Sequence, residues 1–140
     1  MKLLVAVDGS PASLRAVNMA IEFAGGRQSA SVILLTVQNP TMLGPDTGLM
    51  LAAWTEEEEE RAGEEALKEA VAKCQAAGIQ FTTRNERGVP AVMIDQVARQ
   101  ENVDHIIMGS RGLGSVRGLL VGSVATKVLH LVNVPVTIVK

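Results

Sequence analysis

The sequence predicts an α/β fold: one domain over residues 1–140 with a Rossmann-like, doubly wound sheet of five parallel strands in the order 3-2-1-4-5. Several short apolar runs are continuous rather than alternating, which is typical of strands covered on both faces. Segments with helical periodicity separate these runs, which gives the order β-α-β-α-β-α-β-α-β with right-handed crossovers. A glycine-rich segment follows the fourth strand, where folds of this class bind ligands.

The first β-α-β unit is expected over residues 2–37. It begins with an apolar run at residues 2–7, and Ser10 followed by Pro11 has the residue types favoured at a helix start. A glycine pair ends the helix before the second buried strand at residues 31–37. The helix face predicted to be buried consists of Leu14, Val17, Ile21 and Ala24.

Residues 38–54 form a long connection that is unusually apolar. Connections of this length are usually functional or mobile. A lid or a partner surface is one interpretation, and packing onto the domain is the interpretation that we favour. The apolar residues are Met42, Leu43, Leu49, Met50, Leu51 and Trp54.

The longest helix is expected to start after Thr55, which forms a capping-box pattern with Glu58, and to end at Gly78. Residues 56–60 are five successive glutamates, which suit the positive end of a helix. A metal or partner site is the alternative interpretation of this run, and a solvated helix start is favoured. The predicted buried stripe is Ala66, Leu67, Ala70, Val71, Cys74 and Ala77.

The second half of the chain continues the alternation of strands and helices. The alternating segment at residues 79–84 is typical of an edge strand. A turn at residues 88–90 introduces a short helix with Met93, Ile94, Val97 and Ala98 facing inward. The last three elements are a strand at 104–108, a helix at 124–132 with Ser123 as N-cap and Asn133 as C-cap, and a strand at 134–139.

The loop between the strand at residues 104–108 and the helix at residues 124–132 carries the strongest functional signal. Gly109, Gly112 and Gly122 are spaced as G-2x-G-9x-G, and Ser123 follows directly. Glycines let a phosphate approach the backbone closely, and a helix N-terminus presents free N–H groups to an anion. Between Gly109 and Ser123 the loop has two arginines, at 111 and 117, and no acidic residue.

Two better-known phosphate motifs fit this loop poorly. Residues 109–115 match a Walker-type loop only without its lysine, and residues 112–118 are one residue too long for the dinucleotide fingerprint. A flexible loop without a ligand is the remaining alternative. The full spacing together with Ser123 favours a nucleotide.

The predicted strand order brings a second feature to the same place. In the order 3-2-1-4-5 the topological switch point lies between strands 1 and 4, outside their carboxyl ends. Asp8 follows the first strand and Gly109 ends the fourth. We therefore expect both residues at one crevice.

These residues, with the Gly-x-Pro turn at residues 88–90, resemble the ATP-binding branch of the universal stress protein family over essentially the whole chain. The resemblance implies an adenine nucleotide alpha hydrolase-like fold and an ATP site, with Mg²⁺ or Mn²⁺ bound through the phosphates. In that site Asp8 would contact the ribose, the backbone at Val37 would recognise adenine, and Met108 would lie at the same pocket. Gly109, Arg111 and Gly112 would lie along the ribose and phosphates, and Gly122, Ser123 and Val124 would hold the terminal phosphates.

Composition narrows the class of protein. The chain is 47% hydrophobic and 20% charged, with a net charge of −2, which argues against a surface that coats nucleic acid. No apolar run is long enough to span a membrane. A single cysteine excludes an intramolecular disulfide, and the N-terminal run has no charged leader or cleavage site, so we expect a cytoplasmic protein.

Other candidate residues have simpler structural interpretations. His105 and His130 lack companions at metal-ligand spacing, and Cys74 lies on a buried helical stripe, so structural roles are favoured. Asp8 could also suggest a response-regulator receiver. That class needs an acidic pair after strand 1 and a phosphoacceptor Asp after strand 3, where this chain has residues 84–87, Arg-Asn-Glu-Arg.

Two functional hypotheses of different classes remain. The first is an ATP-binding regulatory module of the stress response, which signals to a protein partner and hydrolyses ATP slowly at most. The second is an ATP-consuming enzyme, either an ATPase or an adenylyl-transferring relative. The apolar last strand lies at a sheet edge, and the family resemblance implies a homodimer through that strand.

Overall fold

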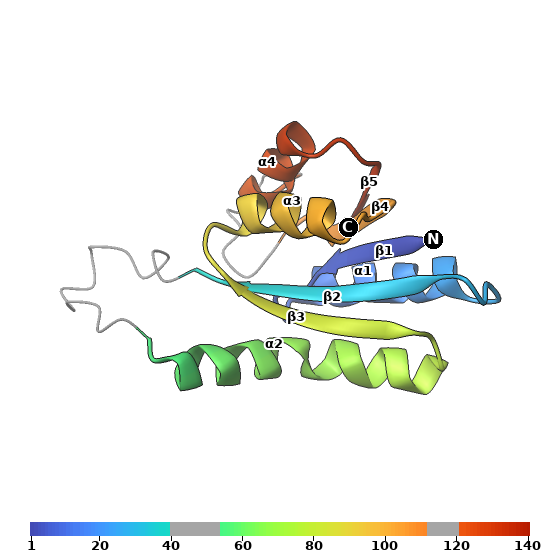
Figure 1. Ribbon diagram of the computed structural model, residues 1–140, viewed down its shortest axis with the longest axis horizontal. Coiled ribbons are helices and arrows are strands. Elements are labelled where there is room, and N and C mark those ends of the chain that lie inside the picture. The colour runs from blue at the N-terminus through green and yellow to red at the C-terminus, as the bar shows by residue number, and fades with distance from the viewer. Residues whose placement is uncertain (40–53, 112–120) are drawn as a thin grey trace.

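Five parallel strands form one sheet in the order β3-β2-β1-β4-β5 (Figure 1), which confirms the strand order expected from the sequence. The computed structural model describes residues 1–39, 54–111 and 121–140. The strands are β1 (Lys2–Ala6), β2 (Ser31–Gln38), β3 (Phe81–Arg87), β4 (His105–Gly109) and β5 (Val136–Val139). The helices in the described residues are α1 (Pro11–Ala24), α2 (Glu56–Ala77), α3 (Pro90–Gln100) and α4 (Ser123–Leu131).

β1 lies at the centre of the sheet and pairs with strands from distant parts of the chain. Its Leu3 faces Val32 of β2 on one side and His105 of β4 on the other. Successive side chains of β1 enter different cores, because Leu3 belongs to the cluster under α1 and α2 whereas Leu4 belongs to the cluster under α3 and α4. This division explains why the strand is apolar at consecutive positions.

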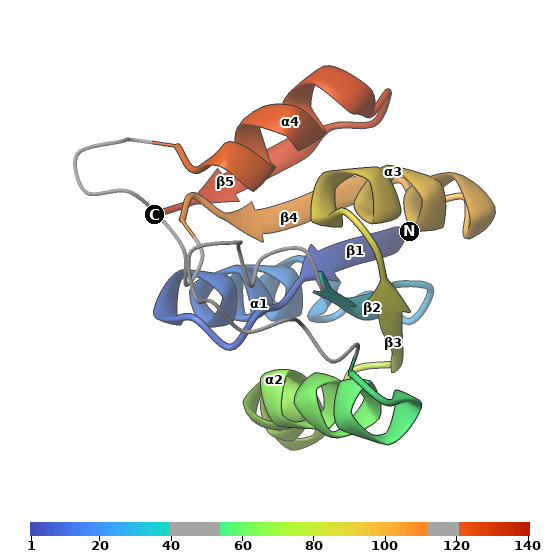
Figure 2. The ribbon, with the colours of Figure 1, turned by 90° about the vertical axis from the view of Figure 1, so that its left-hand side faces the viewer.

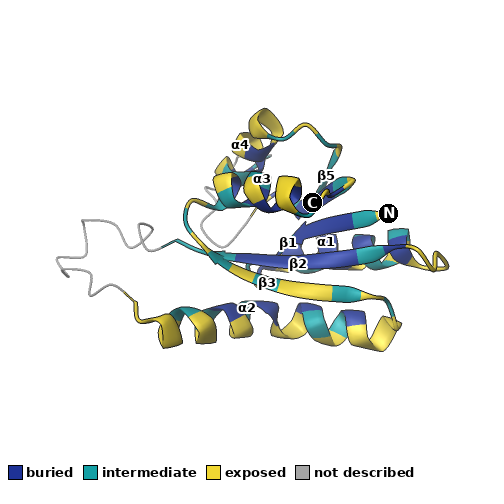
Figure 3. Ribbon diagram, in the orientation of Figure 1, coloured by how far each residue is buried: buried dark blue, intermediate teal, exposed yellow. Residues whose placement is uncertain are grey.

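The helices form one layer on each face of the sheet (Figure 2). α1 and α2 pack on the face that contains Val5 and Leu34, and α3 and α4 pack on the face that contains Leu35 and Ile106. Buried residues concentrate in β1 and β2 and on the inner sides of the helices (Figure 3). The result is a three-layer arrangement with a core on each side of the sheet.

Several helix ends follow the expected capping chemistry. The Ser10 hydroxyl accepts the N–H of Ser13 at 3.2 Å, and Pro11 is the first residue of α1. Thr55 and Glu58 form the reciprocal capping box of α2. Gly78 ends α2 in the left-handed conformation, with φ 65°.

Both edge strands start later than the sequence predicted. β3 spans Phe81–Arg87 rather than residues 79–84, because Ile79 still donates its N–H to Cys74 of α2 and the pairing with β2 continues to Arg87. β5 begins at Val136 rather than at residue 134, and the preceding Pro135 has no N–H to donate to a ladder.

Two other expectations about helices need correction. Ala77 is exposed rather than part of the buried stripe of α2, because it is the last helical residue before the turn at Gly78. Gly63 is buried instead, one turn before Leu67. The C-cap of α4 is Val132 rather than Asn133, since Val132 already has an extended backbone, with φ −87° and ψ 150°.

No helix within residues 1–39, 54–111 and 121–140 is both long enough and apolar enough to cross a membrane.

Candidate functional site

The carboxyl ends of β1 and β4 are neighbours at the end of the sheet where the strands finish, and this end faces the viewer in Figure 2. Asp8 lies two residues beyond the end of β1, and Gly109 is the last residue of β4. The strand ends that carry these two residues therefore lie side by side, as the predicted strand order required. Ligands of open α/β sheets bind at such a switch point.

A tight turn after β1 fixes the position of Asp8. Its Oδ1 accepts the N–H of Ser10 at 2.9 Å, and Gly9 between them has φ 81°, which glycine adopts without strain. Ser10 in turn caps α1. The half-buried carboxyl group is therefore held at the junction of β1 and α1.

Packing alone requires a glycine at position 109. A β-carbon at this position would lie 2.8 Å from the carbonyl carbon and from the Cβ of Ala12, and 3.0 Å from the nitrogen of Ser13. The first turn of α1 thus rests directly on the end of β4. This second role for Gly109 has no signal in the loop sequence, because it depends on a helix about a hundred residues earlier.

The predicted N-cap of α4 is one residue too late. Gly122, rather than Ser123, is the N-cap, because Gly122 has an extended backbone (φ −69°, ψ 167°) and its carbonyl accepts the N–H of Thr126 at 3.0 Å. Ser123 is the first helical residue and is exposed. Gly122 cannot make a side-chain cap, so this helix begins without the hydroxyl that the sequence analysis assigned to it.

Ser110 joins the two ends of the glycine loop to the last strand. Its carbonyl accepts the N–H of Gly122 at 2.5 Å, and its own N–H donates to the carbonyl of Val139 at 2.7 Å. A β-carbon on Gly122 would lie 3.1 Å from the Ser110 oxygen, so glycine permits this close approach. Sequence analysis missed Ser110, and its main-chain contacts leave no pattern by which it could have been found.

The other predicted site residues differ in accessibility. Met108 is 4% exposed, and both Met108 and the half-buried Val37 pack in the core under α3 and α4. Val124 is half-buried against the same core. Arg111 is exposed directly after Ser110. Gly112 lies outside the described residues, as does Arg117.

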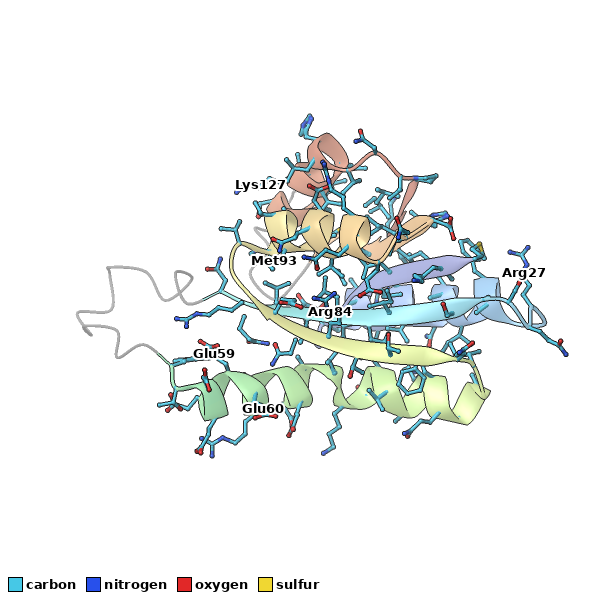
Figure 4. The ribbon with its side chains drawn as sticks, in the orientation of Figure 1. Arg27, Glu59, Glu60, Arg84, Met93 and Lys127 are labelled. Carbon is cyan, nitrogen blue, oxygen red and sulfur yellow. The ribbon has the colours of Figure 1, made fainter. Side chains whose placement is uncertain are left out.

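The electrostatics at the start of α4 favour an anion. The first turn of α4 has no acidic residue, and its N-cap residue Gly122 provides no side-chain cap for the free N–H groups. Lys127 is exposed on the next turn of the same helix (Figure 4). Among the described residues, no three His, Cys, Asp or Glu side chains gather closely enough to hold a metal ion.

Of the three residues with structural interpretations, His105 and Cys74 occupy structural positions, whereas His130 is exposed on α4. The Nε2 of His105 lies 2.7 Å from the Thr137 hydroxyl of β5, and its ring makes an edge-on contact with Phe23 at 5.8 Å. Cys74 is fully buried in α2, and burial raises the pKa of its thiol to about 11. A thiol with that pKa is a poor nucleophile near neutral pH.

Comparison with known proteins decides the family. A sequence model described as the universal stress protein family matches residues 1–140. The chain belongs to this family.

Curated universal stress proteins from a bacterium and an archaeon are similar over nearly the whole chain. YxiE of Bacillus subtilis is 32% identical over 99% of this chain and 98% of its own length. MJ0531 of Methanocaldococcus jannaschii is 31% identical over 99% of this chain and 81% of its own length. The family assignment therefore covers both the glycine loop and the core.

Solved structures of universal stress proteins and related proteins share the fold. That of MJ0577 from Methanocaldococcus jannaschii has a TM-score of 0.81 at 27% identity and covers 99% of this chain and 94% of its own. A universal stress protein solved in complex with cAMP has a TM-score of 0.74 at 26% identity and covers 100% of this chain and 97% of its own.

Proposed function

We propose that this universal stress protein binds ATP at the carboxyl edge between β1 and β4 and acts as a nucleotide-dependent regulatory module of the stress response. The observation that carries the proposal is the start of α4. Gly122 gives the first N–H groups of this helix no side-chain cap, and the first turn contains no acidic residue, so these groups can bind a phosphate. The family relative solved with cAMP supports a nucleotide as the anion.

Each predicted residue has a proposed part in this site. Asp8 accepts hydrogen bonds from the ribose hydroxyls, and the backbone at Val37 recognises the base, with Met108 in the core beneath. Backbone N–H groups at the start of α4 bind the terminal phosphates, and Mg²⁺ or Mn²⁺ is bound through those phosphates. The proposed ribose and phosphate contacts are Gly109, Arg111, Gly112, Gly122, Ser123 and Val124.

The test uses charge at the first residue of α4. Ser123 is exposed at that position, so Ser123→Asp should leave the fold intact and even stabilise α4 through the helix dipole. The new carboxylate would repel the phosphates, and we expect at least a tenfold loss of ATP affinity, about 1.4 kcal/mol. Calorimetric titration with MgATP measures the affinity, and thermal unfolding measures the stability.

Two control variants separate charge from other effects. Ser123→Asn has nearly the shape of the Asp variant without its charge and should change ATP affinity by less than about threefold. Gln28→Glu adds the same charge at an exposed turn between α1 and β2 and should leave affinity unchanged. ATP binding of wild-type strength in a folded Ser123→Asp variant would sink the proposal.

We also propose that the protein forms a homodimer through β5. The two sheet edges differ in character: β3 carries Arg84, Glu86 and Arg87, whereas three of the four residues of β5 are aliphatic. All four β5 residues are only half-buried in this chain. Charged edges resist pairing with another sheet and uncharged edges invite it, so two copies of β5 pair about a two-fold axis.

Light scattering tests the homodimer at micromolar protein concentration, with and without ATP. We expect the mass of two chains. A single-chain mass under both conditions would remove the homodimer from the proposal and leave the ATP site standing.

A further inference from the structure

We propose that ATP binding and pairing of β5 with a second copy strengthen each other through Ser110, an inference that rests on the proposed function above. Ser110 is 5% exposed and lies between the candidate phosphate site and the proposed dimer edge. Both of its backbone groups are engaged, one toward each place. It is therefore a positioning residue for the site and for the edge strand together.

One side of Ser110 determines where α4 starts. The Ser110 carbonyl accepts the N–H of Gly122, the N-cap of α4, and it occupies the space that a side chain on Gly122 would need. Phosphates bound by the N–H groups of Ser123 and Val124 would hold this helix start in place. They would thereby also hold the carbonyl of Ser110.

The other side of Ser110 determines where β5 ends. The Ser110 N–H donates to Val139 at 2.7 Å, one residue beyond the Gly109–Val139 pair that closes the β4–β5 ladder. The guanidinium Nε of Arg15 on α1 donates to the carbonyl of Lys140 at 2.5 Å. These two contacts hold the carboxyl end of β5 against β4 and α1.

β5 needs such contacts because it is short and paired on one side only. It has four residues, lies last in the strand order, and pairs with β4 alone among the strands of residues 1–39, 54–111 and 121–140. Short edge strands of this kind open more easily than central ones. A second copy can pair only with an ordered β5. The free energy of dimer formation must therefore offset the entropy that β5 loses on ordering, unless a bound ligand has already ordered the strand.

Bound ATP would order β5 in part, because it would hold the start of α4 and, through Ser110, the end of β5. The coupling is reciprocal, so the factor by which ATP tightens the dimer equals the factor by which dimer formation tightens ATP binding. We expect a factor of about ten, inside the range typical of coupled sites.

The experiment measures the dimer dissociation constant by sedimentation equilibrium of the full chain, without nucleotide and with saturating MgATP. We expect the constant to fall about tenfold with MgATP. Arg15→Met removes the guanidinium that holds the end of β5 and keeps the apolar stem, so it should reduce the factor to below about three. Hydrogen exchange of residues 136–139 should slow on ATP addition in the wild type, and less in Arg15→Met.

Arg27→Met is the matched control. It removes the same charge at the end of the molecule opposite Glu59 and the start of α2 (Figure 4). There the Nη1 of Arg27 lies 3.8 Å from the Met1 sulfur and far from β5. This variant should keep the full tenfold effect. Loss of the effect in Arg27→Met as well would overturn the role of Arg15.

The outcomes separate this inference from the proposed function. Calorimetric ATP binding with an unchanged dimer constant, or an equal tightening in Arg15→Met and wild type, would overturn the coupling alone. A protein that binds ATP and stays monomeric would also overturn it. Failure to bind ATP would overturn the proposed function and the coupling with it.

Discussion

Gly63 of α2 packs directly on the side chain of Asn85 of β3, and a β-carbon on Gly63 would overlap the Asn85 amide. Asn85 cannot move away freely, because its Nδ2 donates to the Glu59 carbonyl at 3.0 Å and its Oδ1 accepts from Gln38 at 3.3 Å. The contact joins the first half of α2 to the edge strand.

Because of this contact, the effect of Gly63→Ala on stability should depend on whether Asn85 is present. Gly63→Ala alone should lower the free energy of unfolding by about 1–3 kcal/mol, because the overlap outweighs the better helix propensity of alanine. In an Asn85→Ala background the overlap is gone, and Gly63→Ala should be neutral or raise stability by up to about 1 kcal/mol. Urea denaturation of the four proteins measures both effects. Equal costs of Gly63→Ala in both backgrounds would refute the contact.

Alanine substitutions of Gly109 and Gly122 should destabilise the protein to different degrees. Gly109→Ala would set a β-carbon 2.8 Å from Ala12 of α1 and should cost about 1–3 kcal/mol, since two backbone segments must separate. Gly122→Ala meets the Ser110 oxygen at 3.1 Å and should cost less. Thermal unfolding without nucleotide gives the ranking, and a reversed order would contradict this packing. A valine at Gly122 would disturb the fold as well as the site, which is why charge at Ser123 is the better probe.

Cys74 predicts a loss of stability at alkaline pH. Burial raises the pKa of its thiol from 9.0 to about 11, so the folded state keeps the proton that the unfolded chain releases. The stability from this group is complete below pH 9 and is lost as the pH rises toward 11, by about 2–3 kcal/mol.

The measurement for Cys74 is the free energy of unfolding as a function of pH. Cys74→Ala has a smaller core side chain and lower stability throughout, but it should show a flatter decline between pH 9 and 11. Parallel curves for the two proteins would show that the thiol contributes nothing to the pH dependence. The folded wild type should also resist alkylation at pH 8, because the thiol is both protonated and fully buried.

ATP hydrolysis by the isolated protein should be well below the ~1 s⁻¹ low end of typical enzymes. Efficient hydrolysis needs a group that orients the attacking water. The segment from Gly109 to Ser123 has no Asp, Glu, Gln or His, and Asp8 is proposed at the ribose end. A steady-state phosphate-release assay checks the rate. Several turnovers per second, abolished by Ser123→Ala, would favour an ATP-consuming enzyme instead.

The strand order, and with it the neighbouring positions of the strand ends that carry Asp8 and Gly109, could be predicted because the strands have recognisable local patterns. Continuous apolar runs identified β1, β2 and β4, and the parallel order placed Asp8 and Gly109 at neighbouring strand ends. The strand bounds were less certain at the edges. There, polar residues such as Glu86 and Arg87 pair with β2 without any apolar pattern to mark them.

What the sequence could not predict depends on contacts between distant segments. The close approach of Ala12 to Gly109 depends on how α1 lies across β4, and the two bonds of Ser110 involve only main-chain atoms. The shift of the α4 N-cap from Ser123 to Gly122 has a similar origin. Serine is the better cap by residue type, but the bond between Gly122 and Ser110 fixes where the helix begins.

The central position of β1 has a consequence for how the protein is made. β1 is synthesised before the other four strands of its sheet, yet its Leu3 pairs with His105 of β4, about a hundred residues later. At ~5–20 residues per second, β1 waits about 5–20 s for that partner to be synthesised. During this interval one open side of an uninterrupted aliphatic strand is available to chaperones and to other nascent chains, so translation speed should influence the yield of native protein.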